Sequence, residues 1–314
     1  MRTIADVGEF GLIAEVTAGL ESPPEVYVGP GDDGAVLAVA SPLVVSTDLL
    51  VEHVHFRRDW GSAFDTGRKA VAVSVSDLEA MGATGRNVIV GFTAPKTLEA
   101  DWAVDCVRGI RAECEVAGMS LVGGDMTSGS EIVLAMTVLG ELDGVAPVLR
   151  SGARAGDEVA VLGRLGWAAA GLAVLSRGFR SPRAVVHAYQ CPAPFYGAGK
   201  VAAEAGATAM IDVSDGLLAD LGHIAQASGV VIDVTLEAFD VPDPLQAVAQ
   251  ATGKDPLQFI LTGGEDHALA ATFPPGTELE GWTVIGTVLA PGDEGPGVTV
   301  DGEVWDGPTG WTHF

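Results

Sequence analysis

The feature that most constrains this chain is a glycine-rich stretch near its N-terminus, VGPGDDGAV at Val28–Val36. Its three glycines formally spell GxGxxG, the fingerprint of dinucleotide-binding proteins, but that fingerprint requires a helix directly after the turn. A β-rich run follows here instead. The adjacent carboxylates of Asp32 and Asp33 repel each other, and repel a phosphate, unless a divalent cation lies between them. The stretch therefore predicts a metal-binding turn.

The charge balance excludes several classes of partner. The chain has 17 Lys+Arg against 42 Asp+Glu, a net charge of −25, which disfavours nucleic acid and anionic membranes. The N-terminus lacks the apolar segment of a signal peptide, and no apolar run approaches the roughly 20 residues that span a bilayer. The three cysteines, Cys106, Cys114 and Cys191, have no metal-binding spacing and suit a reducing compartment. We expect a soluble cytoplasmic protein.

Helical and β patterns are interspersed along all 314 residues, which predicts an α/β (α+β) fold with mixed sheets flanked by helices. A turn at 144–147 predicts two domains, 1–145 and 146–314. The expected helices are 5–19, 65–81, 100–117, 167–176, 196–205, 217–228 and 244–252. The expected strands are 26–28, 35–39, 42–46, 51–56, 87–93, 119–122, 131–142, 158–162, 209–213, 230–236, 268–273, 282–289 and 298–300.

Asp77 lies on the face of the 65–81 helix that its pattern predicts to be buried. It shares that face with Ala70, Val73 and Met81. A buried carboxylate without a partner costs several kcal/mol by order of magnitude, so we expect Asp77 to have one. A salt bridge or a helix-cap bond would satisfy it, but basic residues are scarce nearby, which favours a metal ion.

Four more carboxylates are predicted to end β-rich runs beside glycine, serine or threonine: Asp33, Asp48, Asp125 and Asp212. One such residue would mean little, because aspartate is common in turns. Together with Asp77, and without a cysteine or histidine cluster, they predict a carboxylate cage for a hard cation such as Mg²⁺, Mn²⁺ or Ca²⁺. Several Mg²⁺ ions held by aspartates usually serve a polyphosphate such as ATP. The residues alone thus indicate metal-dependent phosphoryl chemistry.

Three other patterns carry weaker signals. His53 and His55 fall on one face of the expected 51–56 strand, but two histidines alone rarely make a metal site. The glycine turn at 163–166 can hold a phosphate, although most such turns serve packing. Residues 197–200, GAGK, resemble the tail of a P-loop, but the upstream glycine is absent and Val201 replaces the required hydroxyl.

In the order and combination of its motifs, the chain resembles the thiamine-monophosphate kinase family of the AIR synthase-like ATP-binding superfamily. The resemblance runs nearly end to end. It is carried by Gly8-Glu-Phe-x-Leu-Ile13, Gly31-Asp-Asp33, Ser46-Thr-Asp48, His55-Phe56, Ser76-Asp-Leu-x-Ala-Met-Gly-Ala83, Gly123-Gly-Asp125, Arg150-Ser-Gly-Ala153, Asp212-x-Ser-Asp-Gly-Leu217, Asp220-Leu-Gly-His223 and Gly263-Gly-Glu-Asp266.

The resemblance implies a two-domain AIR synthase-like fold and a homodimer whose N-terminal domains pair through their sheets. It also implies direct transfer of the γ-phosphoryl group of ATP to thiamine monophosphate. The implied Mg²⁺ ligands are Asp33, Ser46, Thr47, Asp48, Asp77, Asp125, Asp212 and Asp215. The implied ATP contacts are Gly124, Asp125, Arg150 and Ser214, and those to thiamine monophosphate are His55, Glu265 and Trp311. Asp33, Asp77, Asp125, Arg150 and Asp212 are expected to act in catalysis.

Two departures from the family pattern concern the substrates rather than the metal ligands. Met126 stands where the family usually has threonine, and Gln190-Cys-Pro-Ala-Pro194 replaces an Arg-Pro-x-Pro segment. Alternatives within the superfamily are aminoimidazole ribonucleotide synthase and selenophosphate synthetase; the latter would carry a catalytic cysteine near the N-terminus, and the first here is Cys106. A non-catalytic nucleotide-binding scaffold and a metal-dependent phosphohydrolase are the alternatives from other classes.

Overall fold

The computed structural model describes residues 2–20, 24, 26–28, 36–278, 280–293 and 295–312. Asp32 and Asp33 lie outside the described residues. The contacts divide the chain into two compact domains, one formed by Met1–Leu78 and Thr84–Gly144, the other by Glu79–Ala83 and Val145–Phe314. No helix in the described part of the chain is long and apolar enough to cross a membrane.

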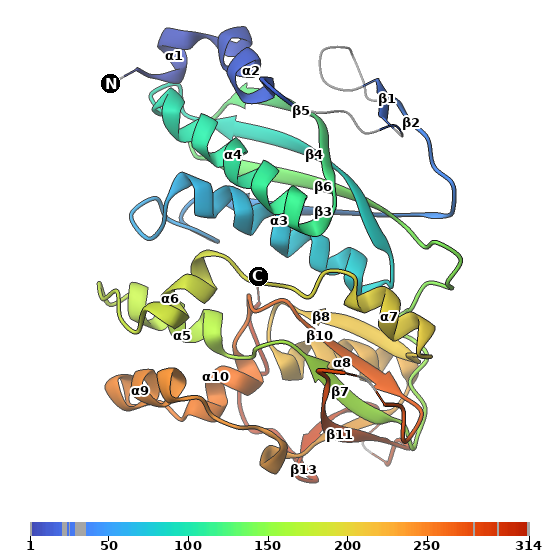
Figure 1. The fold of residues 1–314 in the computed structure, drawn as a ribbon. Coiled ribbons are helices and arrows are strands. Elements are labelled where there is room, and N and C mark those ends of the chain that lie inside the picture. The colour runs from blue at the N-terminus through green and yellow to red at the C-terminus, as the bar shows by residue number, and fades with distance from the viewer. Residues whose placement is uncertain are drawn as a thin grey trace. The chain divides into compact units, whose positions relative to one another are not determined.

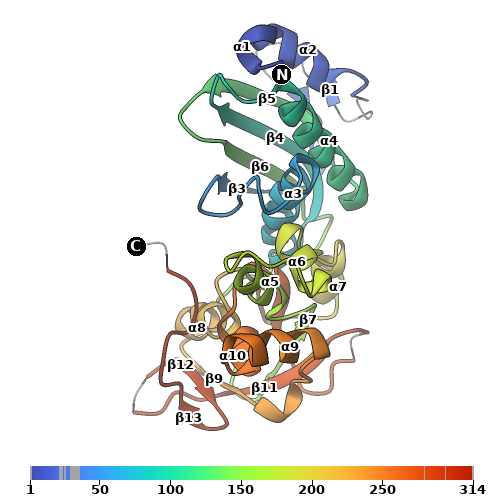
Figure 2. The ribbon, with the colours of Figure 1, turned by 90° about the vertical axis from the view of Figure 1, so that its left-hand side faces the viewer.

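The first domain is a four-stranded sheet with helices on one face (Figures 1 and 2). The strand order is β3-β6-β4-β5, with β4 and β5 parallel and the other pairs antiparallel. The helices are α1 (Ile4–Val7), α2 (Glu9–Thr17), α3 (Ala63–Ala80) and α4 (Ala100–Ala117). The sheet strands are β3 (Leu43–Val51), β4 (Thr84–Ala94), β5 (Ser120–Ser128) and β6 (Val133–Glu141), and β1 (Val26–Val28) pairs separately with β2 (Val36–Leu37).

The two faces of this sheet differ because its side chains alternate. Val88, Val90 and Phe92 of β4 are buried on the face that α3 and α4 cover. On β3, the edge strand, Leu43, Val45 and Leu49 are 40%, 56% and 57% exposed. Figure 2 shows no described helix over that second face. One apolar sheet face is therefore left open within the described chain.

The second domain contains a seven-stranded mixed sheet of order β13-β12-β9-β11-β7-β10-β8. Its strands are β7 (Glu158–Leu162), β8 (Ala209–Val213), β9 (Val231–Val234), β10 (Ala268–Phe273), β11 (Thr283–Leu289), β12 (Gly297–Val300) and β13 (Glu303–Val304). Its helices are α5 (Trp167–Leu175), α6 (Arg183–Gln190), α7 (Ala198–Glu204), α8 (Leu217–Ser228), the short η1 (Leu236–Ala238), α9 (Asp243–Thr252) and α10 (Pro256–Thr262).

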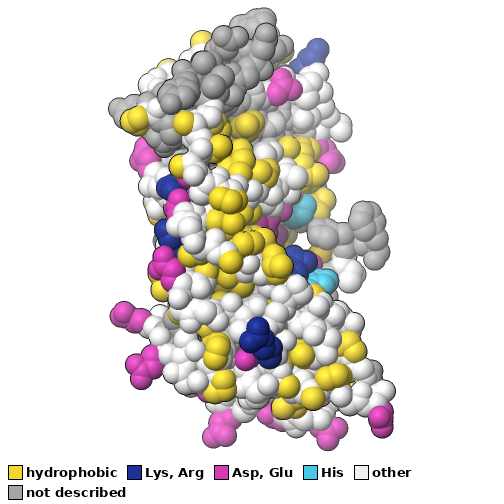
Figure 3. Space-filling model, turned by 90° about the vertical axis from the view of Figure 1, so that its right-hand side faces the viewer, with side chains coloured by type: hydrophobic (Ala, Val, Ile, Leu, Met, Phe, Trp, Pro, Cys, Tyr) yellow, Lys and Arg dark blue, Asp and Glu magenta, His cyan; other side chains and the backbone are white. Residues whose placement is uncertain are grey.

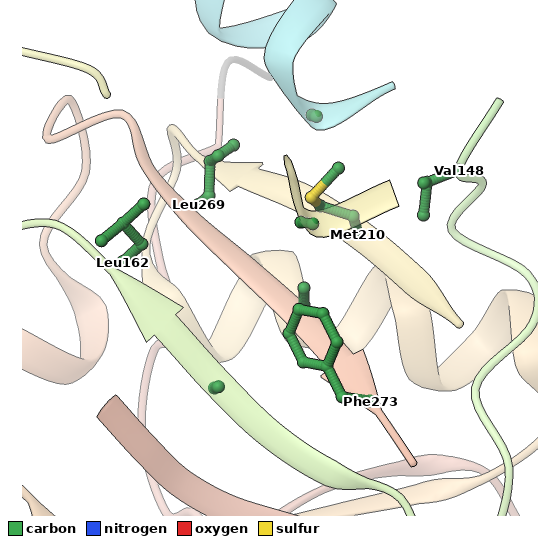
Figure 4. Close-up of a cluster of buried hydrophobic side chains, with 9 residues drawn as sticks. Val148, Leu162, Met210, Leu269 and Phe273 are labelled. Atoms are coloured by element: carbon green, nitrogen blue, oxygen red, sulfur yellow. The ribbon is translucent and has the colours of Figure 1, made fainter. Parts of the chain in front are cut away.

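A buried cluster on the β7-β10-β8 part of this sheet forms one core of the second domain (Figure 4). Leu269 and Phe273 lie four residues apart on β10 and so project to the same side, together with Leu162 of β7 and Met210 of β8. Val148 joins them from the segment before β7. This packing fixes the strand ends from which the residues of the candidate site extend.

Acidic side chains are scattered over the face drawn in Figure 3 and form no single patch there, whereas hydrophobic side chains gather toward its middle. Most acids on this face therefore belong to a solvated surface.

Several expected elements differ from the structure. Asp48 and Asp125 were expected at strand ends but lie inside β3 and β5. The expected strand at 51–56 is a turn after β3, in which His53 takes a positive φ of 70°, so the two histidines do not share a strand face. Gly8, with φ 76°, divides the expected 5–19 helix into α1 and α2. The helices α6 and α10 were not expected.

Candidate active site

In the first domain, α3 and β3 bring two candidate residues into contact. The Ser46 hydroxyl on β3 donates a hydrogen bond to Oδ2 of Asp77 on α3. Asp77 is half-buried rather than buried, and the prediction that its carboxylate has a partner is confirmed. A hydroxyl and a carboxylate side by side are hard oxygen donors of the kind that Mg²⁺ prefers.

Alternation along β3 separates the neighbouring candidates. Thr47 points to the open face, where its hydroxyl donates to the Met136 carbonyl at 2.8 Å. Asp48 lies on the same side of the sheet as Ser46 and is half-buried. The tripeptide 46–48 therefore presents oxygen donors to both faces of the sheet edge.

The candidates on β5 lie at the opposite edge of the same sheet. The exposed Asp125 is in register with Gly91 of β4, which is in register with Ala135 of β6 and so with Leu49 of β3. Asp125 thus faces the open side of the sheet. Three strand spacings separate the two edges, about 14 Å. Within one chain, Asp125 and the β3 residues are too far apart to share one metal ion.

Gly124 has a structural reason to be glycine that is independent of a nucleotide. A Cβ built at this position would lie 2.4 Å from the carbonyl oxygen of Val90 on the parallel neighbour β4. No side chain fits there without displacing the backbone. The glycine before Asp125 therefore sets how closely β5 approaches β4.

Hydrogen bonds hold His55 in the turn after β3, one of them from its own N–H to the Val51 carbonyl at 2.9 Å. The Val51 N–H donates to His55 Nδ1 at 3.1 Å, and the Lys69 ammonium donates to the His55 carbonyl at 3.1 Å. Lys69 is only 1% exposed. Lys69 was not among the expected site residues, although Lys69, Val73 and Asp77 follow one another at helical i, i+4 spacing and so share a face of α3.

The second domain gathers five of the predicted residues around the end of β8. Asp212 lies within β8, and Ser214 and Asp215 follow it. The Glu265 N–H donates to the Ser214 carbonyl at 2.7 Å, and the Trp311 N–H donates to the Asp215 carbonyl at 2.9 Å. Residues far apart in the sequence thereby form one compact group.

Two glycines permit the close approach of these segments. A Cβ on Gly264 would lie 2.5 Å from the Ser214 carbonyl oxygen, and one on Gly310 would lie 2.6 Å from that of Asp215. Both clashes are with backbone atoms, which cannot rotate away. The segments that carry Glu265 and Trp311 therefore pack directly on the turn that carries Ser214 and Asp215.

The electrostatics of this group are dominated by carboxylates. Burial raises the pKa of the Asp220 carboxyl to about 7, and the charges of Asp212 and Asp215 contribute to the rise. Three backbone N–H groups, of residues 214–216, donate to Asp220 Oδ2 at 3.0–3.1 Å. His267, which the sequence analysis missed, places Nδ1 3.0 Å from Asp212 Oδ2. The negative potential of such a group suits a cation.

The two glycine turns that were considered for phosphate hold carboxylates of the chain instead. Asp266 accepts the Gly166 and Ala168 N–H groups at 2.6 and 2.8 Å, at the start of α5. Glu79 accepts the Gly197 and Gly199 N–H groups at 2.7 and 2.8 Å, at the start of α7. Burial raises the pKa of both carboxyls, that of Asp266 to about 7. The packing interpretation of the 163–166 turn and the rejection of a P-loop at 197–200 agree with these contacts.

Arg150 stands apart from the group around Asp212. Its carbonyl accepts the hydroxyl of Ser228 at 3.0 Å, at the last residue of α8, whereas Ser214 and Asp215 lie just before the first. The 12 residues of α8 span about 18 Å. The exposed Arg150 side chain therefore starts from the opposite end of α8.

The donor set fits a hard cation, but the described residues do not assemble it fully. Among them, no three His, Cys, Asp or Glu side chains lie close enough together to hold a metal ion. The candidates are divided between two edges of the first sheet, the end of β8 in the second domain, and Asp33 outside the described residues. Their oxygen chemistry is that of Mg²⁺ ligands rather than Zn²⁺ ligands.

A cavity of about 440 Å³ lies in the first domain between α1, α2 and the ends of β4 and β5. Leu12, Phe92 and Met126 give it an apolar lining, and Lys96 and Thr127 add polar groups. Met126 follows Asp125 directly in the sequence. The cavity can accept a flat group with a few polar atoms next to the β5 edge.

Comparison with known proteins identifies the family to which the chain belongs. Residues 31–142 match the model of the AIR synthase related protein, N-terminal domain, and residues 154–297 match that of the C-terminal domain. A thiamine-monophosphate kinase from Mycobacterium tuberculosis is 47% identical over 99% of this chain and 93% of its own length. The enzyme of that name from Aquifex aeolicus is 34% identical over 99% of both chains.

Solved structures agree with these relatives. AaThiL complexed with AMPPCP and TMP superposes with a TM-score of 0.81 at 34% identity, covering 100% of this chain and 99% of that one. Thiamine-monophosphate kinase from Stenotrophomonas maltophilia gives 0.81 at 31% identity, covering 94% and 95%. Hydrogenase maturation protein HypE in complex with ATP, 21% identical with a TM-score of 0.69, shares the fold. With both halves and the full length matched, the chain belongs to the thiamine-monophosphate kinase family and has its two-domain AIR synthase-like fold.

Proposed function

We propose that this chain transfers the γ-phosphoryl group of ATP to thiamine monophosphate, giving thiamine diphosphate and ADP. The observation that carries the proposal is the convergence of Ser214, Asp215, Glu265 and Trp311 on one turn of the second domain. The family resemblance assigns Ser214 to ATP, Glu265 and Trp311 to thiamine monophosphate, and Asp215 to Mg²⁺. A relative that matches the whole chain at 34% identity was solved with AMPPCP, an ATP analogue, and TMP.

The chemistry needs positioning and charge neutralisation more than acid–base catalysis. The acceptor is already an ionised phosphate, so no general base is required to create the nucleophile. The site must hold two mutually repelling anions in line for direct transfer. The flat, cationic rings of thiamine monophosphate suit an exposed aromatic such as Trp311, which is 62% exposed. Arg150 starts from a surface position whose charge can meet a phosphate of ATP.

Mg²⁺ is part of the proposal. When bound, it neutralises phosphate charge and lowers the repulsion between donor and acceptor. Ser46 and Asp77 would hold it from β3 and α3, with Thr47 and Asp48 beside them. Further ions would be held by Asp33 and Asp125 in the first domain and by Asp212 and Asp215 in the second.

A homodimer is also part of the proposal, and the strand order supports it. The metal ligands on β3 and on β5 lie about 14 Å apart across one sheet, so one chain cannot join them around one ion. The open sheet face is apolar and its exposed strand carries Leu43, Val45 and Leu49. A second copy packed on this face would bring another β5 edge toward the side of β3 that carries Thr47. Leu49→Lys should then produce a monomer in sedimentation and lower turnover, whereas an unchanged sedimentation coefficient would argue against the interface.

The reaction is best tested by turnover of the purified full chain. ATP, Mg²⁺ and thiamine monophosphate are incubated with it, and thiamine diphosphate is measured, with EDTA and unphosphorylated thiamine as controls. Product formed only from the monophosphate and only with Mg²⁺ is expected. Binding of ATP without thiamine diphosphate would refute the assigned acceptor. We place the reaction in the cytoplasm, where ATP is available and where buried free thiols such as Cys106 and Cys114 stay reduced.

A further inference from the structure

The contact between His267 and Asp212 is a buried polar pair with no role in the reaction as proposed. Nδ1 of His267 lies 3.0 Å from Oδ2 of Asp212, and the two residues are 7% and 4% exposed. An ionised carboxylate only accepts hydrogen bonds, so the ring nitrogen carries the hydrogen and donates it. The imidazole thus fixes one of the two oxygens of Asp212.

The backbone around His267 is held in a costly conformation that keeps the ring in place. His267 has φ 52° and Glu265 has φ 66°, the left-handed region that costs residues other than glycine about 1–2 kcal/mol. The N–H of His267 donates to the Val213 carbonyl at 2.9 Å. Such strain persists where surrounding contacts enforce it, and it is typical of functional sites.

The strand register brings the backbones of His267 and Asp212 close together. Ala268, the first residue of β10, is in register with Val213, and Leu269 is in register with Asp212. His267 therefore comes directly before the strand that pairs with β8, two residues before the register partner of Asp212. The same strand pair anchors the backbones of both residues, which places the imidazole beside the carboxylate.

We propose that His267 is a positioning residue, which holds the Asp212 carboxylate in the orientation required of a cation ligand. This inference rests on the proposed role of Asp212 as a Mg²⁺ ligand. Partners that orient a metal ligand typically contribute 10–100-fold to metal affinity. A merely structural role, in which His267 only satisfies a buried carboxylate, would instead affect stability without affecting cation binding.

Two substitutions separate the hydrogen bond from the shape of the side chain. His267→Asn keeps an N–H donor near the position of Nδ1, and asparagine tolerates a positive φ better than most residues. His267→Leu is of similar size but cannot donate. Asp212→Asn serves as the reference for loss of the ligand, and His187→Leu, at an exposed histidine on α6, serves as the control.

The probe is Mn²⁺ alone, titrated into each full-length variant, with free Mn²⁺ measured by electron paramagnetic resonance and thermal unfolding recorded in parallel. We expect His267→Leu and Asp212→Asn to weaken the affected site by 10–100-fold. His267→Asn should stay within about threefold of the parent protein, and His187→Leu should match it.

Parent-like Mn²⁺ affinity in His267→Leu, with or without a lower unfolding temperature, would overturn the inference. Equal losses of Mn²⁺ affinity in His267→Leu and His267→Asn would overturn the inference as well, because the N–H donor at this position would then have no effect on binding. Parent-like affinity in Asp212→Asn would remove Asp212 from the metal site and refute the inference with it. The thiamine diphosphate assay on the unsubstituted protein reports separately whether the proposed kinase reaction itself stands.

Discussion

The carboxylate of Asp266 should make the second domain lose stability as the pH rises toward neutrality. Its two oxygens accept the Gly166 and Ala168 N–H groups at the start of α5. Burial raises its pKa from 3.8 to about 7, although both hydrogen bonds lower it. At a pH between these two pKa values, Asp266 keeps its proton in the folded chain but has released it in the unfolded chain. The stabilisation is therefore complete below about pH 4 and is lost as the pH rises through 7.

The magnitude follows from the size of the shift. Three pH units at about 1.4 kcal/mol each give an upper bound of about 4 kcal/mol for the loss in free energy of unfolding. The partial exposure of Asp266 reduces the expected loss to about 2 kcal/mol. Asp266→Asn cannot titrate, but its amide keeps only one acceptor and so costs about 1–2 kcal/mol at every pH. The variant should be less stable than the parent at pH 5 and equal to it or more stable at pH 8.

Urea unfolding at half-unit steps from pH 5 to pH 8 tests this crossing. Tryptophan fluorescence is a suitable signal, because Trp167 is the first residue of α5 and lies next to the bonds in question. The titrations of all other groups are common to both proteins, so the difference between the two curves isolates Asp266. Parallel curves, with the variant less stable by a constant amount, would refute a raised pKa at this residue.

Three further predictions concern the candidate site. Asp77→Asn should lower kcat by roughly 100-fold or more while leaving the thermal unfolding temperature intact, and near-normal turnover would remove Asp77 and its Ser46 contact from the catalytic cage. Trp311→Ala should raise the KM for thiamine monophosphate by about 2–30-fold, equivalent to about 0.5–2 kcal/mol, with the KM for ATP unchanged; equal effects on both would contradict a ring contact. Gly264→Ala should destabilise the fold by about 1–3 kcal/mol, because its Cβ would lie 2.5 Å from a backbone oxygen. Gly222→Ala is the matched control, since nothing lies within 4 Å of its added Cβ, and it should not lose stability in the same urea titration.

Local patterns predicted the regular elements where one physical signal dominates. The expected ranges of α4, α8, β7, β8 and β10 are those of the structure, because each combines an unbroken period with a clear boundary. Gly118 and Gly229 end α4 and α8 in the left-handed conformation. The fold class and the family were also predicted from the sequence, and both are confirmed by the comparisons.

The same patterns gave wrong strand ends where glycine, serine or threonine lies inside a strand rather than in a turn. The pair before Asp125 was interpreted as a strand end, but Gly124 lies inside β5, where its missing side chain lets β4 approach. Ser46 and Thr47 likewise lie inside β3. Turn propensity describes the backbone conformations that a residue favours locally, whereas strand pairing depends on partners that are remote in the sequence.

Local sequence patterns could not predict the contacts in the site between residues that are far apart in the sequence. His267 and Asp212 are 55 positions apart, and Glu79 reaches residues 118 and 120 positions away. A histidine beside an acidic motif has no distinctive spacing by itself. The assignments that came from the family resemblance, such as Trp311 for the thiamine rings, remain predictions until the variants are measured.

The carboxylates at the helix starts of the second domain have a consequence for which form of the nucleotide can bind. Backbone N–H groups at the starts of α5, α7, α8 and α10 donate to the carboxylates of Asp266, Glu79, Asp220 and Asp255. The amides that would otherwise attract a phosphate are already used by the chain itself. A tetra-anionic nucleotide without its metal would meet acids there and be repelled, whereas the metal complex carries half that charge. Under the proposed Mg²⁺-dependent reaction, turnover would therefore follow the concentration of the metal–nucleotide complex rather than that of total nucleotide.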